Sequence, residues 1–324
     1  MGTTLILDGD SIAYRCAAAV EERGILVKHK PSGKSMEFKT RTEFKEHMSN
    51  RKKDITEDYE IEDTQDPGSV SIVLRTMKQH VEKVANACNA DEVIIYAGER
   101  DNFRNTLPLP SKYKGNRTGL IRPLNLDAAK AYLRNSLGAK LAIGYEVDDA
   151  CCIAAYEAKA KGKKAVMYWY EKDQNSFDGI YLLKQEGDEF HETLVPSLGS
   201  LWKDKTEIRG LGFKFLAYQW IFSDLVDAYR ASEVSTTVKR FGKGSAFKIL
   251  DPLSTEQEVA QAIVDQFKKF YPEPVTYSDW TGKEQTKDWK EMLDMYFKCA
   301  RMKRSEDDQL DSTAFLASKG VDIG

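Results

Sequence analysis

Cysteine and histidine are scarce in this sequence, and neither is arranged for chemistry. The five cysteines are odd in number, show no C-x-x-C spacing, and include the adjacent pair Cys151 and Cys152 in an apolar helical run. We therefore expect reduced thiols in a packed core and no disulfide framework. The four histidines are scattered without the spacing of a metal site and without a nucleophile partner, so we expect them at surface or packing positions.

Long apolar runs and a strong net charge are also missing. No segment approaches the roughly 20 apolar residues of a membrane helix, and the N-terminus passes into a predicted strand without a basic stretch or signal-like run. These absences predict a protein of the reducing cytoplasm with no membrane partner. The net charge of −3 creates no global field for a polyanion, so such a partner would be held by local patches or by metal.

What the chain does contain is the pattern of an α/β protein. Its 324 residues, 41% hydrophobic and 31% charged, suit one large globular domain or two smaller ones. Strands are predicted at 3–7, 92–97, 141–143, 165–170 and 180–183, alternating with helices at 12–20, 69–87, 125–137 and 147–161. This alternation predicts a mostly parallel central sheet flanked by helices.

Three further segments complete the predicted organisation. Residues 24–39 alternate on both sides of a Pro-Ser-Gly sequence, which predicts a hairpin. The charged residues 50–67 have poor periodicity, and we expect a mobile surface excursion there. Beyond about residue 206 the pattern turns helical, with candidate helices at 211–222, 254–270, 285–302 and about 309–318.

A set of acidic side chains occurs where strands end or helices begin. They are Asp8, Asp10, Glu146, Asp148, Asp149, Asp173, Asp224 and Asp227. Ligands in open parallel sheets lie beyond the carboxyl ends of the strands, so separate segments can converge there. Carboxylates held together repel each other, which raises a pKa or requires a cation. Such a set suits Mg²⁺ or Mn²⁺ better than zinc, and two such ions can promote phosphodiester hydrolysis.

For any single acidic cluster, the alternative is a charge that complements a helix N-terminus. The recurrence of the pattern in four separated segments favours the metal site.

Two segments are basic in an otherwise slightly acidic chain. Residues 100–123, RDNFRNTLPLPSKYKGNRTGLIRP, contain six Lys or Arg against one acid, with Phe103 and Tyr113 interleaved. Such a segment can contact phosphates and stack on an unpaired base, so we predict a mobile substrate loop; an ordinary solvated loop is the alternative. Residues 238–248, VKRFGKGSAFK, contain glycines that permit a tight turn, whose N–H groups could hold one phosphate.

Together these motifs resemble a known family. LILDGDSIAYR, NFR with PLPSKYKGNR, YEVDDACCIAAYEA, EKD and SDLVDAY are similar, in order and spacing, to bacteriophage 5′→3′ exonucleases of the flap-endonuclease (PIN-like) superfamily. WTGKEQTKDW and MYFKCARMKR resemble the C-terminal part of some phage members. The most specific combination is KYKGNR followed by E-x-D-D.

The resemblance implies a PIN-like catalytic domain over residues 1–205, with a basic arch near 98–123. Residues 206–324 would form a helical DNA-binding region resembling a modified helix–three-turn–helix. Two Mg²⁺ or Mn²⁺ ions would serve hydrolysis at DNA 5′ ends, flaps or RNA primers, in the cytoplasm of an infected bacterial cell. The implied partners of a monomeric enzyme are DNA with a free 5′ end or flap, an RNA–DNA hybrid, and replication proteins.

The resemblance also implies roles for individual residues. The expected metal ligands are Asp8, Glu146, Asp148, Asp149, Glu171, Asp173, Asp224 and Asp227. Lys114 and Arg117 match the arch cations that contact the scissile phosphate. The expected substrate contacts, which include the second basic segment, are Arg104, Lys112, Tyr113, Lys239, Arg240 and Lys243. Asp10 lies where the family usually has no ligand.

Two motifs depart from the family pattern. Glu171 stands in place of an aspartate, and its extra methylene moves the oxygens by about one bond length at a site where Mg²⁺ is exacting. The segment 223–228, SDLVDA, replaces Gly-Asp-x-x-Asp-Asn, and the glycine-rich turn that normally follows is absent from the sequence. These departures favour an alternative, a relative that binds branched or 5′-ended DNA without efficient cleavage.

A third hypothesis is a phosphatase, because LILDGDS also resembles an aspartyl-phosphate motif. Asp8 would then be the nucleophile and Asp10 the acid. This hypothesis leaves KYKGNR unexplained.

Overall fold

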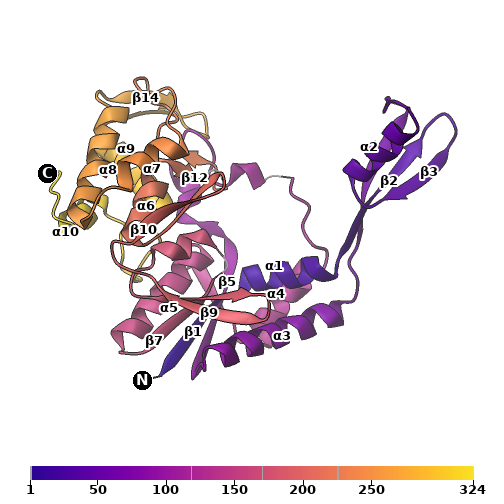
Figure 1. Cartoon of the computed structure of the whole chain (residues 1–324), viewed down its shortest axis with the longest axis horizontal. Helices are drawn as coiled ribbons and strands as arrows, with labels where there is room; N and C mark the ends of the chain where they lie inside the picture. The colour runs from indigo at the N-terminus through magenta and orange to yellow at the C-terminus, as the bar shows by residue number, and fades with distance from the viewer. Residues whose placement is uncertain (1, 118, 170, 225) are drawn as a thin grey trace. The chain divides into compact units, whose positions relative to one another are not determined.

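The computed structural model describes residues 2–324 apart from 118, 170 and 225, and apart from the side chains at 100 and 223. Its elements, which are labelled in Figure 1, fall into two compact units by their internal contacts. The first comprises residues up to Asp10 together with 82–120 and 138–324, and the second comprises 11–81 and 121–137. The boundary near residue 205 stays a prediction about the catalytic and DNA-binding regions.

The first unit contains a six-stranded sheet, in the order β6-β5-β1-β7-β8-β9. The strands are β6 (Lys140–Gly144), β5 (Glu92–Asn102), β1 (Thr3–Asp8), β7 (Lys164–Tyr168), β8 (Tyr181–Glu186) and β9 (Glu189–Leu194). β1 pairs in parallel with both β5 and β7, whereas β8 and β9 are antiparallel. The predicted fold class, a mostly parallel sheet with helices, is confirmed. Tyr170, the predicted end of its strand, lies outside the described residues.

Helix α5 (Val147–Ala160) packs against the central strands β1 and β7. Its sequence runs DDACCIAAYEA, and the small apolar residues let the helix lie close to the sheet. Cys151 and Cys152 are completely buried there, and the other three cysteines are buried as well. Cysteine thus behaves here as a small core residue, as its sequence context predicts.

The predicted C-terminal helices are present in the same unit. They are α6 (Gly212–Ile221), α8 (Glu256–Phe270), α9 (Trp289–Ala300) and α10 (Ser312–Ser318). A further helix, α7 (Lys243–Leu250), begins in the second basic segment, where the sequence predicted a turn. Trp220 of α6 is fully buried, with its ring centre 4.5 Å from that of Phe297 in α9. Aromatic packing of this kind builds a second core in this part of the chain.

The hairpins in this region were not predicted from the sequence. β10 (Ser200–Asp204) pairs with β11 (Glu207–Leu211), and β14 (Val275–Ser278) pairs with β15 (Glu284–Lys287). The predicted helix start at 285 is therefore wrong. Residues 284–287 are paired in a strand, and Asp288 caps α9 by accepting a hydrogen bond from Glu291 N.

The second unit includes a small antiparallel sheet covered by one helix. β2 (Glu22–His29) lies between β3 (Lys34–Phe38) and β4 (Tyr59–Asp66), and α2 (Arg41–Asn50) contributes Phe44 to the core with Ile25 and Val27. The predicted hairpin is confirmed. The expectation of a mobile excursion at 50–67 is wrong, because 59–66 pairs with the whole length of β2. Alternate charged residues on the solvent face concealed this strand in the sequence.

The remaining helices are α1 (Gly9–Val20), α3 (Val70–Ala87) and α4 (Leu126–Asn135). Asn125, the first residue of the predicted helix, is the N-cap position of α4; its side chain donates to the carbonyl of Pro67 at 2.7 Å and makes no capping hydrogen bond. Among the described residues, no helix is both long and apolar enough to cross a membrane.

Candidate active site

The predicted acids gather at the carboxyl ends of parallel strands. Asp8 ends β1, the acids that begin α5 follow β6, and Asp173 follows β7 in the short helix η3 (Lys172–Ser176). Because these strands are parallel, their carboxyl ends share one edge of the sheet. Asp224 reaches the same place from β12 (Ser223–Asp224), which pairs with β13 (Tyr229–Arg230), and Asp227 lies in the turn between them.

Three of these carboxylates form a buried group. Asp173, Asp224 and Asp227 each offer an oxygen within 4.8 Å of the others. Burial raises the pKa of Asp173 to about 7, and the charges of Asp227 and Asp224 add to the effect. Burial also raises the pKa of Asp227, although Lys114 opposes it. The group is strained electrostatically unless a proton or a cation neutralises it.

Asp148 belongs to the same cluster. Its pKa lies well above the usual range because of burial, and then because of the charges of Glu171, Asp8 and Asp173. Within the described part of the chain, its Oδ1 atom is buried and has no hydrogen-bond partner. A buried carboxylate oxygen that faces other carboxylates and lacks a donor is a natural position for a cation.

The donor set therefore fits a hard divalent cation such as Mg²⁺ or Mn²⁺, which prefers carboxylate oxygen. Of the residues that could hold it, Asp173, Asp224 and Asp227 lie close enough to share one ion. The charges of Asp8, Glu171 and Asp173 act on the neighbouring Asp148. Two polar neighbours orient this set. The side chain of Gln219 in α6 donates to Asp173, and the ammonium of Lys172 lies 2.6 Å from an oxygen of Asp224.

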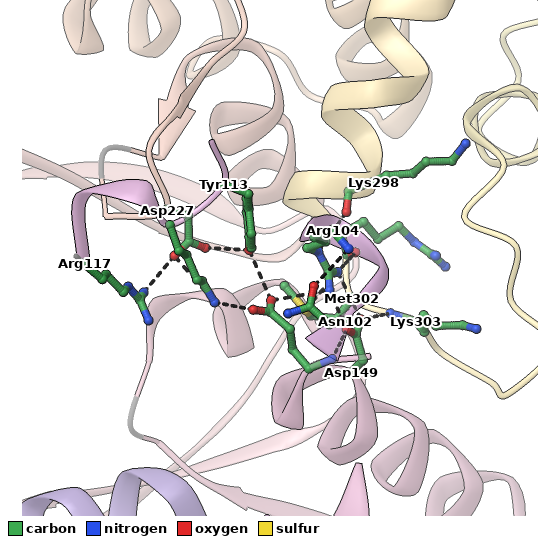
Figure 2. Close-up of polar contacts among 12 residues, drawn as sticks. Asn102, Arg104, Tyr113, Arg117, Asp149, Asp227, Lys298, Met302 and Lys303 are labelled. Carbon is green, nitrogen blue, oxygen red and sulfur yellow. Dashed lines mark hydrogen bonds and ion pairs between the residues drawn. The ribbon is translucent and has the colours of Figure 1, made fainter. Parts of the chain in front are cut away.

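The basic segment brings its central cations to these acids (Figure 2). Lys114 Nζ lies 2.5 Å from Glu146 Oε1 and 3.7 Å from Asp227 Oδ1. Arg117, in the short helix η2 (Gly115–Arg117), donates to Asp227 Oδ1 at 2.8 Å. Burial by itself would lower the pKa of Lys114, but Glu146 and Asp227 outweigh it and raise the pKa, so this ammonium stays charged.

Tyr113 lies beneath these cations and not on the surface. It is 2% exposed, and its hydroxyl is 3.1 Å from Glu146 Oε2 and 3.0 Å from Asp227 Oδ2. Burial, Glu146 and Asp227 together raise its pKa well above the usual range, so the phenol is neutral. The expected stacking of Tyr113 on substrate is not available in this arrangement, because its ring is covered.

Arg104 is also placed differently from the expectation (Figure 2). Its guanidinium is completely buried and donates to Asp149 at 2.5 and 3.1 Å, and to the carbonyls of Lys298 and Arg301 at 2.9 Å each. Asp149 also accepts from the backbone N–H groups of Glu146 and Lys303. Arg104 and Asp149 thus form an internal pair, which occupies the groups expected to bind substrate and metal.

These anchors correct the picture of a mobile basic loop. β5 continues to Asn102, whose side chain accepts a hydrogen bond from Arg104 N at the start of η1 (Phe103–Thr106). Further along, the backbone N–H of Lys114 donates to the carbonyl of Asp227 at 2.8 Å. The proline and glycine content of the basic segment suggested flexibility. Burial and hydrogen bonding instead hold much of it in place.

The second basic segment does not form the predicted phosphate turn. Gly242 has φ −111° and precedes α7 as its N-cap, so the backbone is extended there. Lys243 pairs with Glu207 at 2.5 Å, while Lys239 and Arg240 are exposed in the preceding segment. Lys112 is exposed as well, with its Nζ 5.1 Å from the ring centre of Trp280.

Sequence reasoning missed the neighbours that orient the acids. Gln219 is a polar residue within an otherwise apolar helix, FLAYQWI, and that contrast is a usable signal for a buried polar role. Lys172 lies between two predicted ligands in the sequence. The carbonyls of Lys298 and Arg301 carry no such signal, because any residue can supply a carbonyl.

No family model and no curated protein matches this sequence. Among solved structures, the chain resembles the T5 D15 protein co-crystallised with metal ions, at 15% identity and a TM-score of 0.46, over 98% of this chain and 92% of that one. It also resembles T5 5′-exonuclease with bound zinc, at 15% identity and a TM-score of 0.41, over 92% and 98% of the two chains. A third is the bacteriophage T5 flap endonuclease in a pseudo-enzyme–product complex with DNA and metal ions, at 14% identity and a TM-score of 0.43, over 92% and 99%.

These three are structures of T5 proteins and include a 5′-exonuclease and a flap endonuclease. At TM-scores below 0.5 the likeness carries no information about the site, whose chemistry follows from its own side chains.

Proposed function

We propose that this protein is a divalent-metal-dependent nuclease that hydrolyses phosphodiester bonds near the 5′ end of a nucleic acid. The observation that carries the proposal is the convergence of buried acids on one sheet edge beside two cations. Asp148 contributes a buried oxygen that accepts no hydrogen bond from the part of the chain that the structure describes. Lys114 and Arg117 of the basic segment form ion pairs with the neighbouring carboxylates of Glu146 and Asp227. Acids alone indicate a metal; the added cations indicate an anionic substrate.

The bound metal would supply activation of water and neutralisation of phosphate charge. The chain supplies the rest. Lys114 and Arg117 present N–H donors that can bind the non-bridging oxygens of a phosphate, where negative charge develops. Glu146 and Asp227 hold these cations in place before substrate arrives. The neutral hydroxyl of Tyr113 lies between the same two carboxylates and holds them at a fixed separation.

The preference for a 5′ end rests on the resemblance of the KYKGNR and E-x-D-D motifs to the phage 5′→3′ exonucleases. The substrate would be DNA with a free 5′ end or flap, or an RNA–DNA hybrid. The protein would act as a monomer in the cytoplasm of an infected bacterial cell, alongside replication proteins.

End-labelled substrates test this proposal. With Mg²⁺ or Mn²⁺, linear duplex, a 5′ flap and an RNA–DNA hybrid should lose nucleotides from the 5′ end, whereas closed circular DNA should stay intact. The double substitution Asp148→Asn with Asp173→Asn should reduce the rate by at least about 100-fold, because it removes charge from the metal site. Asp188→Asn, whose side chain is fully exposed, is the matched control. Digestion by the double variant at the parent rate would overturn the metal assignment.

A second candidate function is binding without efficient cleavage. Two acids of the cluster already have cationic partners, since Lys172 pairs with Asp224 and Arg117 pairs with Asp227. Tight binding of flap DNA in EDTA, with no product in either metal, would identify this function. Hydrolysis of a small phosphomonoester by a DNA-inactive protein would instead support the phosphatase hypothesis with Asp8 as nucleophile.

A further inference from the structure

The β14–β15 hairpin is bound to the basic segment that carries Lys114. Tyr277 donates its hydroxyl to the carbonyl of Pro108 at 2.7 Å. Trp280, in the hairpin turn, donates its backbone N–H to the carbonyl of Leu109 at 2.9 Å and its indole N–H to the carbonyl of Leu107 at 3.1 Å. Residues far apart in the sequence therefore form one surface next to the candidate active site.

The turn holds the indole in a fixed place. The carboxylate of Asp279 accepts hydrogen bonds from the backbone N–H of Thr281 at 2.9 Å, its hydroxyl at 2.6 Å, the backbone N–H of Lys283 at 3.1 Å and the amide of Gln285 at 2.8 Å. Four donors from three residues leave little freedom to the turn. A side chain mounted on it keeps its orientation before any ligand arrives, which reduces the entropy cost of binding.

The residue Trp280 nevertheless remains 37% exposed. Its backbone N–H and its indole N–H both donate within the protein, so contact with the ring face breaks no hydrogen bond. The ammonium of Lys112, on the basic segment, lies 5.1 Å from the ring centre. A rigid, exposed aromatic ring next to an exposed cation is the combination that single-stranded nucleic-acid sites use.

We propose that Trp280 and Lys112 form a binding site for one unpaired nucleotide of the substrate strand. The indole stacks on the base, and the Lys112 ammonium contacts the adjoining phosphate. A duplex cannot use the site in this way, because its base faces are already stacked. The proposal rests on the proposed function only for the identity of the ligand. Lys112 lies two positions before Lys114, so a nucleic-acid strand that binds at Lys112 can also reach Lys114.

The test measures binding of a single-stranded oligothymidylate to the full-length chain in EDTA, where no cleavage can occur. Trp280→Ala should weaken binding about tenfold, whereas Trp280→Phe, which keeps an aromatic ring, should bind nearly as well as the parent. Trp202→Ala is the matched control, because Trp202 on β10 is 41% exposed. Quenching of tryptophan fluorescence by the oligonucleotide should be strong in the parent and much smaller in Trp280→Phe.

Lys112→Ala leaves the hairpin hydrogen bonds intact and provides a second readout. It should weaken binding and reduce the slope of log Kd against log salt concentration by about 0.7, the value for one phosphate contact on a single strand. An equal loss in Trp280→Phe and Trp280→Ala would show that the indole N–H, and not the ring, matters, and would overturn the site. Unchanged binding by Trp280→Ala, or an equal loss in Trp202→Ala, would also overturn it.

The two proposals fail in different ways. If the parent cleaves 5′-ended DNA in Mn²⁺ while Trp280→Ala binds the oligonucleotide as tightly as the parent does, the nucleotide site is wrong and the nuclease stands. If the parent neither binds the oligonucleotide nor cleaves DNA, both proposals are wrong.

Discussion

Arg104 shows how burial decides the role of a charged residue. The sequence places it in a basic segment, where a substrate contact is the natural expectation. The structure buries its guanidinium against Asp149 and two carbonyl groups. An arginine can satisfy a carboxylate and several carbonyls at once, because its five N–H donors form a fixed planar fork. Its N–H donors are therefore occupied by partners inside the protein.

Arg104→Met should destabilise the protein by about 3–5 kcal/mol, because it leaves Asp149 buried without a cation. Arg117→Met is the comparison, since the Arg117 side chain is 43% exposed in its pair with Asp227. The free energy of unfolding should fall by less than about 1 kcal/mol in that variant. Urea denaturation measures both, and an equal cost for the two substitutions would contradict the internal role of Arg104.

Asp173 makes the stability of the metal-free protein depend on pH. Its pKa is raised to about 7 in the folded state by burial, Asp227 and Asp224. The folded protein thus binds a proton that the unfolded chain, with a pKa near 3.9, releases. The resulting stability is fully present below about pH 4 and is lost as pH rises through 7.

In EDTA, the Tm should therefore fall between pH 5 and pH 8, and the fall should be smaller in Asp173→Asn. Because a metal ion competes with the proton, the rise in Tm caused by Mn²⁺ should grow over the same range. Thermal unfolding with and without Mn²⁺ measures both effects. A Mn²⁺ effect that is independent of pH would argue against Asp173 as a ligand.

At the scale of elements, the site requires close approach between β5 and the start of α5. Gly98 of β5 makes this possible. A Cβ atom at this position would lie 2.8 Å from Val147 Cγ2 and 3.1 Å from Asp10 Oδ2. Val147 is the first residue of α5, which also carries Asp148, so the missing side chain helps to set where the acids lie.

Gly98→Ala should destabilise the protein by about 1–3 kcal/mol through overpacking and should lower the cleavage rate by displacing the start of α5. Gly244→Ala is the matched control, because no atom lies within 4 Å of a Cβ there and the glycine is inside helix α7. That variant should be slightly more stable than the parent. Equal stability and activity for both variants would show that the close contact between Gly98 and Val147 does not determine the position of α5.

At the scale of the whole chain, the last residues belong to the candidate site as well as to the core. Arg301 accepts a hydrogen bond from Arg104, and Lys303 donates one to Asp149. Leu310, Leu316 and Val321 are buried in the same unit. The C-terminal stretch is therefore joined to the acids that follow β6, although Lys303 and Asp149 lie 154 positions apart in the sequence.

A chain that ends at Ala300 should lose cleavage activity and unfold at a lower denaturant concentration. The truncation removes partners of both Arg104 and Asp149, and it exposes the core that Leu316 covers. Cleavage assays and urea denaturation test this, with removal of Gly324 alone as the control. Full activity of the shortened chain would show that the C-terminal contacts do not position the site.

The sheet and most helices could be predicted because their patterns are local. The run Leu5–Leu7, the alternation around residues 24–39 and the apolar spacing of α3 each lie within a few residues. β4 escaped because charged residues occupy its solvent face. The hairpins β10–β11 and β14–β15 escaped because their strands have only four or five residues each. Pairing with β2, which lies about 30 residues earlier in the sequence, and not local preference stabilises β4.

The amino-acid sequence by itself determined the chemical inventory of this protein: carboxylates at strand ends, a basic segment beside them, and motifs that resemble 5′-nucleases. Tertiary structure alone decided how each charge is used. Asp148 has a buried oxygen that accepts no hydrogen bond from any described residue, whereas the carboxylate of its neighbour Asp149 accepts hydrogen bonds from Arg104 and from backbone N–H groups. Adjacent residues on a helix point in different directions, so their partners come from distant segments that no local pattern records.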